Sequence, residues 1–352
     1  MNEKPNLLFV TRTMEIGGTE KVVLQLCEAL KDSCAKIIVC STGGALLPRL
    51  EELGIRHITI PDISTSNPLR LLKIRKTLRR IVKEEQIDII HTHHRMAAFL
   101  CKGLKAKKRI NTIHNTFSDK KALTRFAFKG CQNVACGSAV YDCMTQEYGI
   151  PKDSICTITN SIDPRHVKEP LDYFEKNEKE GLLTFVFVGR LAEQKGVDVL
   201  LNAISLLGDK ASTYRFYLYG SGPWEEQLKE QAKPLDNVFF MGPTNNPLNA
   251  LENADCALLP SRWEGLPLGI IESMAVARPI IASDIGSNAE IVVDGENGLL
   301  FKTEDPVSLS EALLRVKEVD LSKLSKAAKK TYDESFSYEG FIAKYKALYF
   351  GE

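Results

Sequence analysis

Short apolar runs alternate with helical patterns along most of the chain. Runs typical of buried strands cover residues 6–11, 36–40, 57–60, 87–91, 109–113 and 133–136 in the first half. The same alternation restarts in the second half at residues 183–188, 216–219, 238–242, 256–259 and 279–282. Because these runs are apolar nearly throughout, we expect two parallel sheets that carry helices on both faces, an α/β architecture.

The alternation breaks once, in the middle of the chain. Residues 157–164 end the apolar pattern, and a charged stretch with little periodicity follows over residues 168–180. We therefore predict an N-terminal domain over residues 1–165 and a C-terminal domain over residues 166–335. A last helical pattern over residues 336–352 carries aromatic and aliphatic side chains along one side.

The turns after the strands of the second half bear charged residues. Ligands of parallel sheets bind beyond the carboxyl ends of the strands, so these turns are candidate site positions. Arg190 and Lys195 follow the strand at 183–188. Two cations across one turn can grip a diphosphate, with about 1.5–3 kcal/mol from each charge-assisted hydrogen bond.

The run from Ser261 to Ala275 places two carboxylates, Glu264 and Glu272, eight positions apart. Pro267 is a favoured first helical residue, and the backbone N–H groups of Leu268 and Gly269 would then be free to bind phosphate. A glutamate early in a helix is often only solvated. Glu272, however, lies among apolar residues and needs a partner there.

Glycines and histidines follow the strands of the first half. Gly17 and Gly18 can let backbone approach an anion, although any tight turn could use them. His91, His93 and His94 follow one strand, and His114 with Asn115 follows another. The first cluster contains no carboxylate or cysteine, which disfavours a metal site. His114 can hydrogen-bond a hydroxyl or a phosphate oxygen, or serve packing alone.

Composition is that of a globular protein of two domains. The chain has 352 residues, 44% of them hydrophobic, and no stretch approaches eighteen uninterrupted apolar residues. The first residues lead straight into a strand without a signal-peptide pattern, so we expect a cytoplasmic protein. The nine cysteines include no Cys-x-x-Cys pair and are expected to be small buried hydrophobes.

The net charge of +1 hides an asymmetry. Residues 1–170 hold 27 Lys and Arg against 17 Asp and Glu, whereas the remainder holds 19 against 28. Many of the cations lie in the helical pattern over Arg70–Lys83. They form either a solvated helix face or a surface for anionic lipid. Nucleic acid is disfavoured because no aromatic residues are interleaved and no binding motif is present.

Several of these strings together resemble the retaining glycosyltransferases of family 4. They are Val188-Gly189-Arg190-Leu191, Gln194-Lys195-Gly196, Gly220-Ser221-Gly222-Pro223 and the E-x7-E spacing from Glu264 to Glu272, joined by Gly17-Gly18-Thr19-Glu20, Thr112-Ile113-His114 and Asn160. The resemblance covers almost the whole chain. It implies the GT-B fold, in which two Rossmann-like, doubly wound domains face each other across a cleft and the final helix returns to the first domain.

The resemblance also implies residue roles. Arg190 and Lys195 would hold the donor diphosphate, Glu272 the ribose hydroxyls, and Glu264 hydroxyls of the donor sugar. Gly17 and Gly18 would close over the diphosphate, and His114 would touch the sugar or phosphate, which makes His114, Glu264, Arg190 and Lys195 the catalytic set. The donor site would further include Met241, Gly265, Leu266, Pro267, Leu268 and Gly269; the acceptor side would include His93, Asn115 and Asn160. Ser161 and Ser287 depart from the glycines usual at those positions.

These observations predict a retaining transfer of a hexose or N-acetylhexosamine from a UDP-sugar to a hydroxyl of a glycan or lipid-linked acceptor, as in bacterial capsule, exopolysaccharide or lipopolysaccharide assembly. The sequence has no Asp-x-Asp motif, so no metal and no cofactor are expected. The alternatives are a UDP-sugar epimerase of the same fold and a non-catalytic partner subunit. The intact charged residues disfavour the second alternative.

Overall fold

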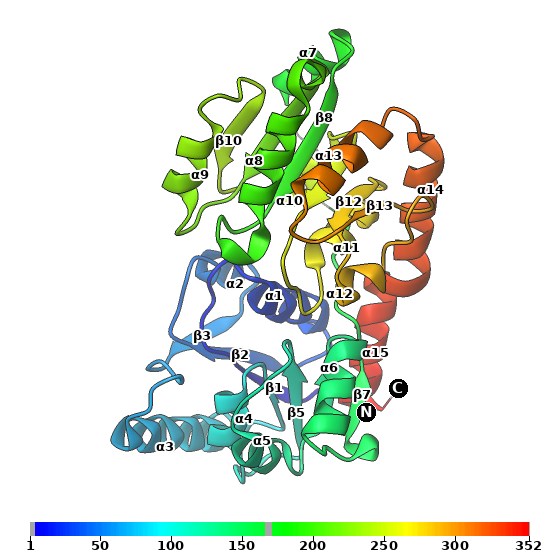
Figure 1. The fold of residues 1–352 in the computed structure, drawn as a ribbon. Coiled ribbons are helices and arrows are strands. Elements are labelled where there is room, and N and C mark those ends of the chain that lie inside the picture. The colour runs from blue at the N-terminus through cyan, green and yellow to red at the C-terminus, as the bar shows by residue number, and fades with distance from the viewer. Residues whose placement is uncertain (1–3, 166–170, 352) are drawn as a thin grey trace. The chain divides into compact units, whose positions relative to one another are not determined.

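The structure is a computed structural model that describes residues 4–165 and 171–351. The chain forms two compact units (Figure 1). Unit 1 contains Met1–Asn160 and Glu339–Glu352, and unit 2 contains Ser161–Tyr338. The division lies five residues before the boundary that the charged stretch suggested, and the C-terminal segment belongs to unit 1.

Unit 1 is built on a sheet of seven parallel strands in the order β3-β2-β1-β4-β5-β6-β7. The strands are β1 (Asn6–Val10), β2 (Lys36–Ser41), β3 (Arg56–Thr59), β4 (Ile89–Thr92), β5 (Lys108–Ile113), β6 (Gln132–Ala135) and β7 (Ile155–Thr157). The helices are α1 (Gly18–Leu30), α2 (Leu47–Glu52), α3 (Pro68–Glu84), α4 (Arg95–Cys101), α5 (Lys121–Phe128), α6 (Ser138–Asp142) and α15 (Tyr338–Phe350), with single turns η1 (Cys143–Glu147) and η2 (Lys152–Ser154).

Unit 2 repeats the plan with six parallel strands in the order β10-β9-β8-β11-β12-β13. The strands are β8 (Leu183–Val188), β9 (Tyr214–Tyr219), β10 (Val238–Gly242), β11 (Cys256–Leu259), β12 (Ile280–Ser283) and β13 (Leu299–Phe301). The helices are α7 (Asp172–Lys179), α8 (Val197–Leu206), α9 (Glu225–Ala232), α10 (Pro247–Glu252), α11 (Leu268–Ala275), α12 (Gly286–Ala289), α13 (Pro306–Arg315) and α14 (Leu321–Thr331), with turns η3 (Glu193–Lys195), η4 (Gly208–Thr213) and η5 (Tyr332–Phe336).

The strand order of each unit reverses once. In unit 1 the chain runs outward from β1 to β3 and then returns to β4 beside β1; in unit 2 it does the same from β8 to β10 and returns to β11. Both sheets are therefore doubly wound, as the apolar strands predicted. Ligands of such sheets bind beyond the carboxyl ends of the strands at this reversal. The turns after β1 and β4, and those after β8 and β11, are thus the places to look for a site.

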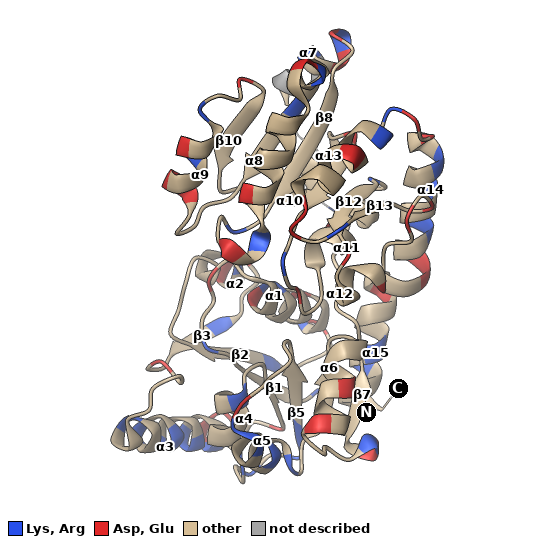
Figure 2. Cartoon of the chain, viewed as in Figure 1, with Lys and Arg blue, Asp and Glu red and all other residues tan. Residues whose placement is uncertain are grey.

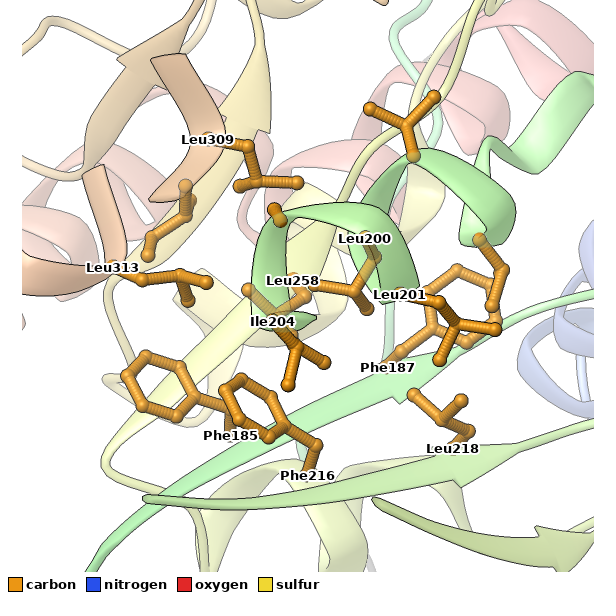
Figure 3. Close-up of a cluster of buried hydrophobic side chains, with 14 of the residues drawn as sticks. Phe185, Phe187, Leu200, Leu201, Ile204, Phe216, Leu218, Leu258, Leu309 and Leu313 are labelled. Carbon is orange, nitrogen blue, oxygen red and sulfur yellow. The ribbon is translucent and has the colours of Figure 1, made fainter. Parts of the chain in front are cut away.

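The core of unit 2 shows why these strands are apolar throughout. Alternate residues of β8 enter different hydrophobic clusters: Phe185 and Phe187 pack in one, and Val186 packs in the other. Figure 3 shows the first cluster, where side chains of β8, β9 and β11 meet leucines and an isoleucine of α8 and α13. The rings of Phe185 and Phe216 stack with centroids 5.1 Å apart. Both faces of the strand are buried, so neither face can be polar.

The sequence missed two short strands. β7 and β13 each have only three residues, too few for an apolar run to stand out from the adjoining loops. Pro267 is the residue just before α11 rather than its first helical residue. The cysteines are free and, apart from the half-buried Cys156, they are buried as expected.

Candidate active site

The turns after β8 and β11 are bound to each other. The Arg262 backbone N–H donates to the carbonyl of Gln194 at 2.8 Å, and the Gln194 side-chain amide donates to the carbonyl of Trp263 at 2.9 Å. Gly196 has φ of 61°, and a Cβ there would lie 2.0 Å from the carbonyl oxygen of Pro260. Only glycine allows this approach, so the two turns form one rigid layer.

Arg262 stabilises this layer by joining several segments of unit 2. Its guanidinium makes two hydrogen bonds to the Asp198 carboxylate, at 3.0 and 2.7 Å, one to the carbonyl of Glu193 and one to Glu304. Asp198 and Glu304 raise the pKa of Arg262 above its usual value. All of these contacts are internal, which makes Arg262 a structural residue. No role was predicted for it, because its partners Asp198, Glu193 and Glu304 are far from it in sequence.

Two of the predicted site residues meet at the carboxyl ends of β8 and β11. The Lys195 ammonium lies 2.5 Å from a carboxylate oxygen of Glu264. The Glu264 side chain is 8% exposed and also accepts a hydrogen bond from the Ser261 hydroxyl at 2.7 Å. Ser261 is held in turn, because the Ser283 hydroxyl donates to its carbonyl oxygen. The carboxylate is therefore fixed by two donors from two elements.

Arg190 differs from Lys195. It is exposed, and within the part of the chain that the structure describes its side chain makes no hydrogen bond or ion pair. The turn that carries it is supported by the next one along the sheet, since a Cβ on Gly220 would lie 1.8 Å from the Gly189 carbonyl oxygen. Met241, near the end of β10, is 39% exposed. Arg190 is thus a charged side chain on a rigid backbone with its guanidinium available.

The first turn of α11 offers backbone groups next to this pair. Gly265 and Leu266 are half-buried turn residues, Pro267 is buried, and the helix begins at Leu268. A Cβ on Gly269 would come no closer than 3.6 Å to any atom that the structure describes beyond its chain neighbours and helix backbone, so packing does not require glycine there. Glu272 lies in the second turn and is buried, at 5% exposure.

Unit 1 brings three histidines together at the corresponding edge. His91 is in β4, His93 follows it, and His114 follows β5. Nδ1 of His93 lies 3.0 Å from Nε2 of His114, and the two rings stack with centroids 5.2 Å apart. Burial lowers the pKa of His91 and of His93 well below the usual value, and it lowers the pKa of His114 to about 4. All three rings are therefore neutral near pH 7.

Helix α15 supports this cluster from within unit 1. The Tyr349 hydroxyl hydrogen-bonds Nδ1 of His91, and Nε2 of His91 lies 2.8 Å from the Thr112 hydroxyl. The Tyr345 hydroxyl in turn lies 2.9 Å from the Thr112 hydroxyl. His91 consequently has both nitrogens engaged and cannot reach a ligand. The sequence showed the apolar side of this helix but could not show the partners of its hydroxyl groups.

A cavity of about 220 Å³ opens beside the histidines, with polar residues after β1, β4 and β5 in its wall; they include Thr13, Glu20, His93, His114 and Asn115. Glu20 accepts a hydrogen bond from the Thr13 hydroxyl at 2.6 Å. Gly17 precedes α1, which starts at Gly18, and this places Glu20 in the helix's first turn. Glu20 was quoted from the sequence only as part of a motif, and no site role was predicted for it.

Two of the remaining predicted positions, Asn160 and Ser161, lie where the two units join in sequence, and the third, Ser287, lies within unit 2. Asn160 is buried, and its side-chain oxygen has no hydrogen-bond partner among the described residues. Ser161, which stands where the family usually has glycine, donates its hydroxyl to the carbonyl of Phe336. Ser287 is half-buried in α12.

Between residues 4 and 165 and between 171 and 351, no group of three or more His, Cys, Asp or Glu is placed to hold a metal ion. Over the same ranges, no helix has both the length and the apolar character needed to span a bilayer.

Comparisons with known proteins identify the family. The family model for glycosyltransferase family 4 matches residues 16–166, and that for glycosyl transferases group 1 matches residues 183–318. An Escherichia coli protein named UDP-Gal:alpha-D-GlcNAc-diphosphoundecaprenol alpha-1,3-galactosyltransferase is 27% identical, over 95% of this chain and 94% of its own. N-acetyl-alpha-D-glucosaminyl L-malate synthase of Bacillus anthracis is 25% identical, over 97% of this chain and 96% of its own.

Solved structures share the fold. A glycosyltransferase from Rickettsia africae superposes with a TM-score of 0.84 at 21% identity, covering 99% of this chain and 98% of the other. The Anabaena protein HepE, solved in complex with UDP, superposes with a TM-score of 0.83 at 18% identity, covering 99% of this chain and 100% of the other. With both units matched by family models and the doubly wound sheets matched by structure, the chain belongs to glycosyltransferase family 4 and has the GT-B fold.

Proposed function

We propose that the protein transfers a hexose or N-acetylhexosamine from a UDP-sugar to a hydroxyl group of a glycan or lipid-linked acceptor, with retention of configuration at the anomeric carbon. The observation that carries this proposal is the contact between Lys195 and Glu264. This contact places a cation that can bind phosphate next to a carboxylate that can bind sugar hydroxyls. The bond that breaks in a nucleotide-sugar is the one between those two parts of the donor.

The charges of unit 2 fit a diphosphate leaving group. Arg190 is exposed without a partner among the described residues, and Lys195 could exchange its bond to Glu264 for one to phosphate. The free N–H groups at the start of α11 lie at the positive end of the helix dipole, which favours a bound phosphate. Preorganised donors of this kind stabilise the charge that develops on the leaving oxygen. We propose that they do so in place of a metal ion.

The proposed step balances without an enzymic base. The bond from the anomeric carbon to the β-phosphate oxygen breaks, and a bond from that carbon to the acceptor oxygen forms on the same face. The acceptor hydroxyl loses its proton to the departing phosphate oxygen, which leaves UDP as the second product. Glu272, buried in α11, would anchor the nucleotide by accepting hydrogen bonds from the ribose hydroxyls.

The relatives support the donor class. The name of the Escherichia coli relative states that it transfers galactose from UDP-Gal to a diphosphoundecaprenol-linked sugar. We propose the same class of donor and a comparable lipid-linked or glycan acceptor for this chain, as in the assembly of a bacterial surface polysaccharide. The sugar and the linkage are left to experiment.

Nuclear magnetic resonance of the purified protein with a panel of UDP-sugars and acceptors tests the proposal. We expect UDP release that depends on the acceptor, and a product whose anomeric coupling matches that of the donor. An inverted product would contradict retention. Interconversion of UDP-sugars without acceptor would identify an epimerase instead, and no turnover with donors that bind would favour a non-catalytic subunit.

We also propose that the protein contacts an anionic membrane surface through α3, as a peripheral protein at the cytoplasmic face. At about 100° per residue, one arc of α3 about 120° wide carries Leu69, Leu72, Lys73, Lys76, Arg79, Arg80 and Lys83. All are exposed, and Leu69 and Leu72 are 75% and 63% exposed. Figure 2 shows the cations along this helix. Of the five cations in the arc, only Arg80 has an ion pair among the described residues.

Helix α14 of unit 2 is a matched control, because Lys323, Lys326 and Lys330 form a similar exposed stripe without an exposed large apolar residue. We expect the parent protein to sediment with phosphatidylglycerol vesicles at low salt. Lys73→Glu with Lys76→Glu should weaken that binding at least tenfold, since each surface cation contributes about 1 kcal/mol. Lys323→Glu with Lys326→Glu should change it little. Equal losses in the two double variants, or no binding by the parent, would overturn the assignment to α3.

A further inference from the structure

The pairing of His93 with His114 restricts where their protons can be. Both rings are neutral near pH 7, so each carries one proton, and the hydrogen bond from Nδ1 of His93 to Nε2 of His114 uses one of them. Either His93 donates and His114 accepts, or the reverse. The two arrangements leave different groups at the other nitrogen of each ring.

The surroundings of His93 distinguish these arrangements. Its Nε2 is buried and has no hydrogen-bond partner among the described residues. If His114 were the donor, His93 would carry its own proton on that nitrogen, as a buried N–H without an acceptor. Unpaired buried N–H groups are rarer in proteins than unpaired acceptors. The favoured arrangement is therefore the one in which His93 donates from Nδ1 and keeps only a lone pair at Nε2.

This arrangement also determines which nitrogen of His114 carries the proton. With Nε2 accepting from His93, the proton of His114 is on Nδ1. That nitrogen makes no hydrogen bond with any described residue, and His114 is partly exposed in the wall of the cavity next to Glu20 and Asn115. His114 thus presents an N–H donor, suited to a hydroxyl or phosphate oxygen of a ligand, rather than a lone pair.

His93 is itself held in a fixed orientation. Its ring packs against His91, with centroids 4.1 Å apart, and against Phe9, at 5.7 Å. His91 cannot turn, because the Tyr349 and Thr112 hydroxyls hold its two nitrogens. His93 is only 4% exposed, its Nδ1 is engaged by His114 and its Nε2 is buried, so its nitrogens are not offered to an acceptor molecule.

We infer that His93 is a positioning residue, whose hydrogen bond fixes the ring orientation and the tautomer of His114 so that Nδ1–H of His114 faces substrate. The inference rests on the proposed function only in naming a sugar or its phosphate as that substrate. The tautomer itself is a property of the free protein, and it can be measured whether or not the protein proves to be a transferase.

The direct test is ¹⁵N nuclear magnetic resonance of the histidine side chains in the full-length protein at pH 7, with His114 assigned by comparison with His114→Asn. We expect a protonated Nδ1 and an unprotonated Nε2 in His114. A proton on Nε2 of His114 in the parent protein would overturn the inference outright, without any variant of His93.

Two substitutions test the cause. His93→Phe keeps an aromatic ring but removes the nitrogens, so it should release the His114 tautomer. We expect kcat to fall about 10- to 100-fold, as when a metal-binding histidine loses its outer hydrogen bond, with KM for the donor nearly unchanged. His93→Asn places an amide near the position of Nδ1 and should restore both the tautomer and most of kcat. An unchanged His114 tautomer in His93→Phe would contradict the inference. If His93→Phe does not fold, the parent spectrum and His93→Asn still decide it.

Discussion

The two units use the same strand order to display different chemistry. At the reversal of the sheet in unit 2, the side chains are charged: Lys195 is paired with Glu264, and Arg190 is exposed. At the reversal in unit 1, the central side chains are two neutral imidazoles that share a hydrogen bond, His93 buried and His114 half-buried. The fold thus determines where a ligand binds, while the residues after the strands determine which part of a ligand each edge can hold.

In the proposed function, the two edges would bind different parts of the substrates. A diphosphate carries charge that must be met by cations and backbone N–H groups, which unit 2 supplies. Sugar hydroxyls are neutral, and neutral imidazoles can hydrogen-bond them without the cost of burying a charge. If this comparison is correct, removing a charge from unit 2 should lower the rate of transfer, whereas protonating the histidines of unit 1 should lower the stability of that unit.

The largest effect is expected from Lys195→Ala. Losing one preorganised donor to the leaving group typically lowers kcat about 10²- to 10³-fold. The control is Lys210→Ala, which removes an exposed lysine of the same unit from the turn η4. Rates of UDP release with saturating donor measure the effect. A Lys195→Ala variant within a few-fold of the parent would remove Lys195 from the catalytic set.

A smaller effect, on stability alone, should follow from Gly196→Ala. The added Cβ would lie 2.0 Å from the Pro260 carbonyl oxygen, and the residue would also keep its left-handed φ of 61°. Gly208→Ala is the matched control, because Gly208 has φ of 55° but open space around it. We expect Gly208→Ala to cost about 1 kcal/mol of unfolding free energy and Gly196→Ala clearly more, as measured by urea unfolding. Equal losses would mean that the two turns of unit 2 are not held as tightly as described.

A third effect is a dependence of stability on pH, which we expect in unit 1, where the described histidines lie. Burial lowers the folded-state pKa of His91, His93 and His114, so the unfolded chain binds protons more readily than the folded one below about pH 6.5. Stability is therefore full above that pH and falls as the pH is lowered toward about 4, by up to about 1.4 kcal/mol per pH unit for each histidine. Unit 2 has no histidine among its described residues.

The two units can be followed separately. Both tryptophans, Trp224 and Trp263, are in unit 2, so fluorescence reports its unfolding, while hydrogen exchange of the β4 and β5 amides reports unit 1. Between pH 7.0 and 5.5 we expect protection in β4 and β5 to fall and the fluorescence transition to change little. Equal shifts in both signals would contradict the difference in proton balance between the units.

Much of the fold and part of the site could be read from the sequence. The strands were predicted because both of their faces are buried, and the position of Glu272 in the second turn of α11 followed from Pro267. The contact of Lys195 with Glu264 could not be predicted, because it joins turns 69 residues apart whose approach depends on Gly196 and Arg262. The pairing of His93 with His114 was missed for the same reason, since it depends on the packing of β4 against β5.

In the proposed function, unit 2 binds a uridine diphosphate through its charged edge and Glu272. Titration calorimetry of UDP with the parent protein and with Glu272→Gln tests it most directly. A charge on one partner adds about 1–1.5 kcal/mol to a hydrogen bond, and glutamine keeps only the neutral bond. The dissociation constant of the variant should therefore rise about 5- to 13-fold. UDP binding of equal strength in the parent and in Glu272→Gln, or no binding of UDP by the parent, would contradict the claim.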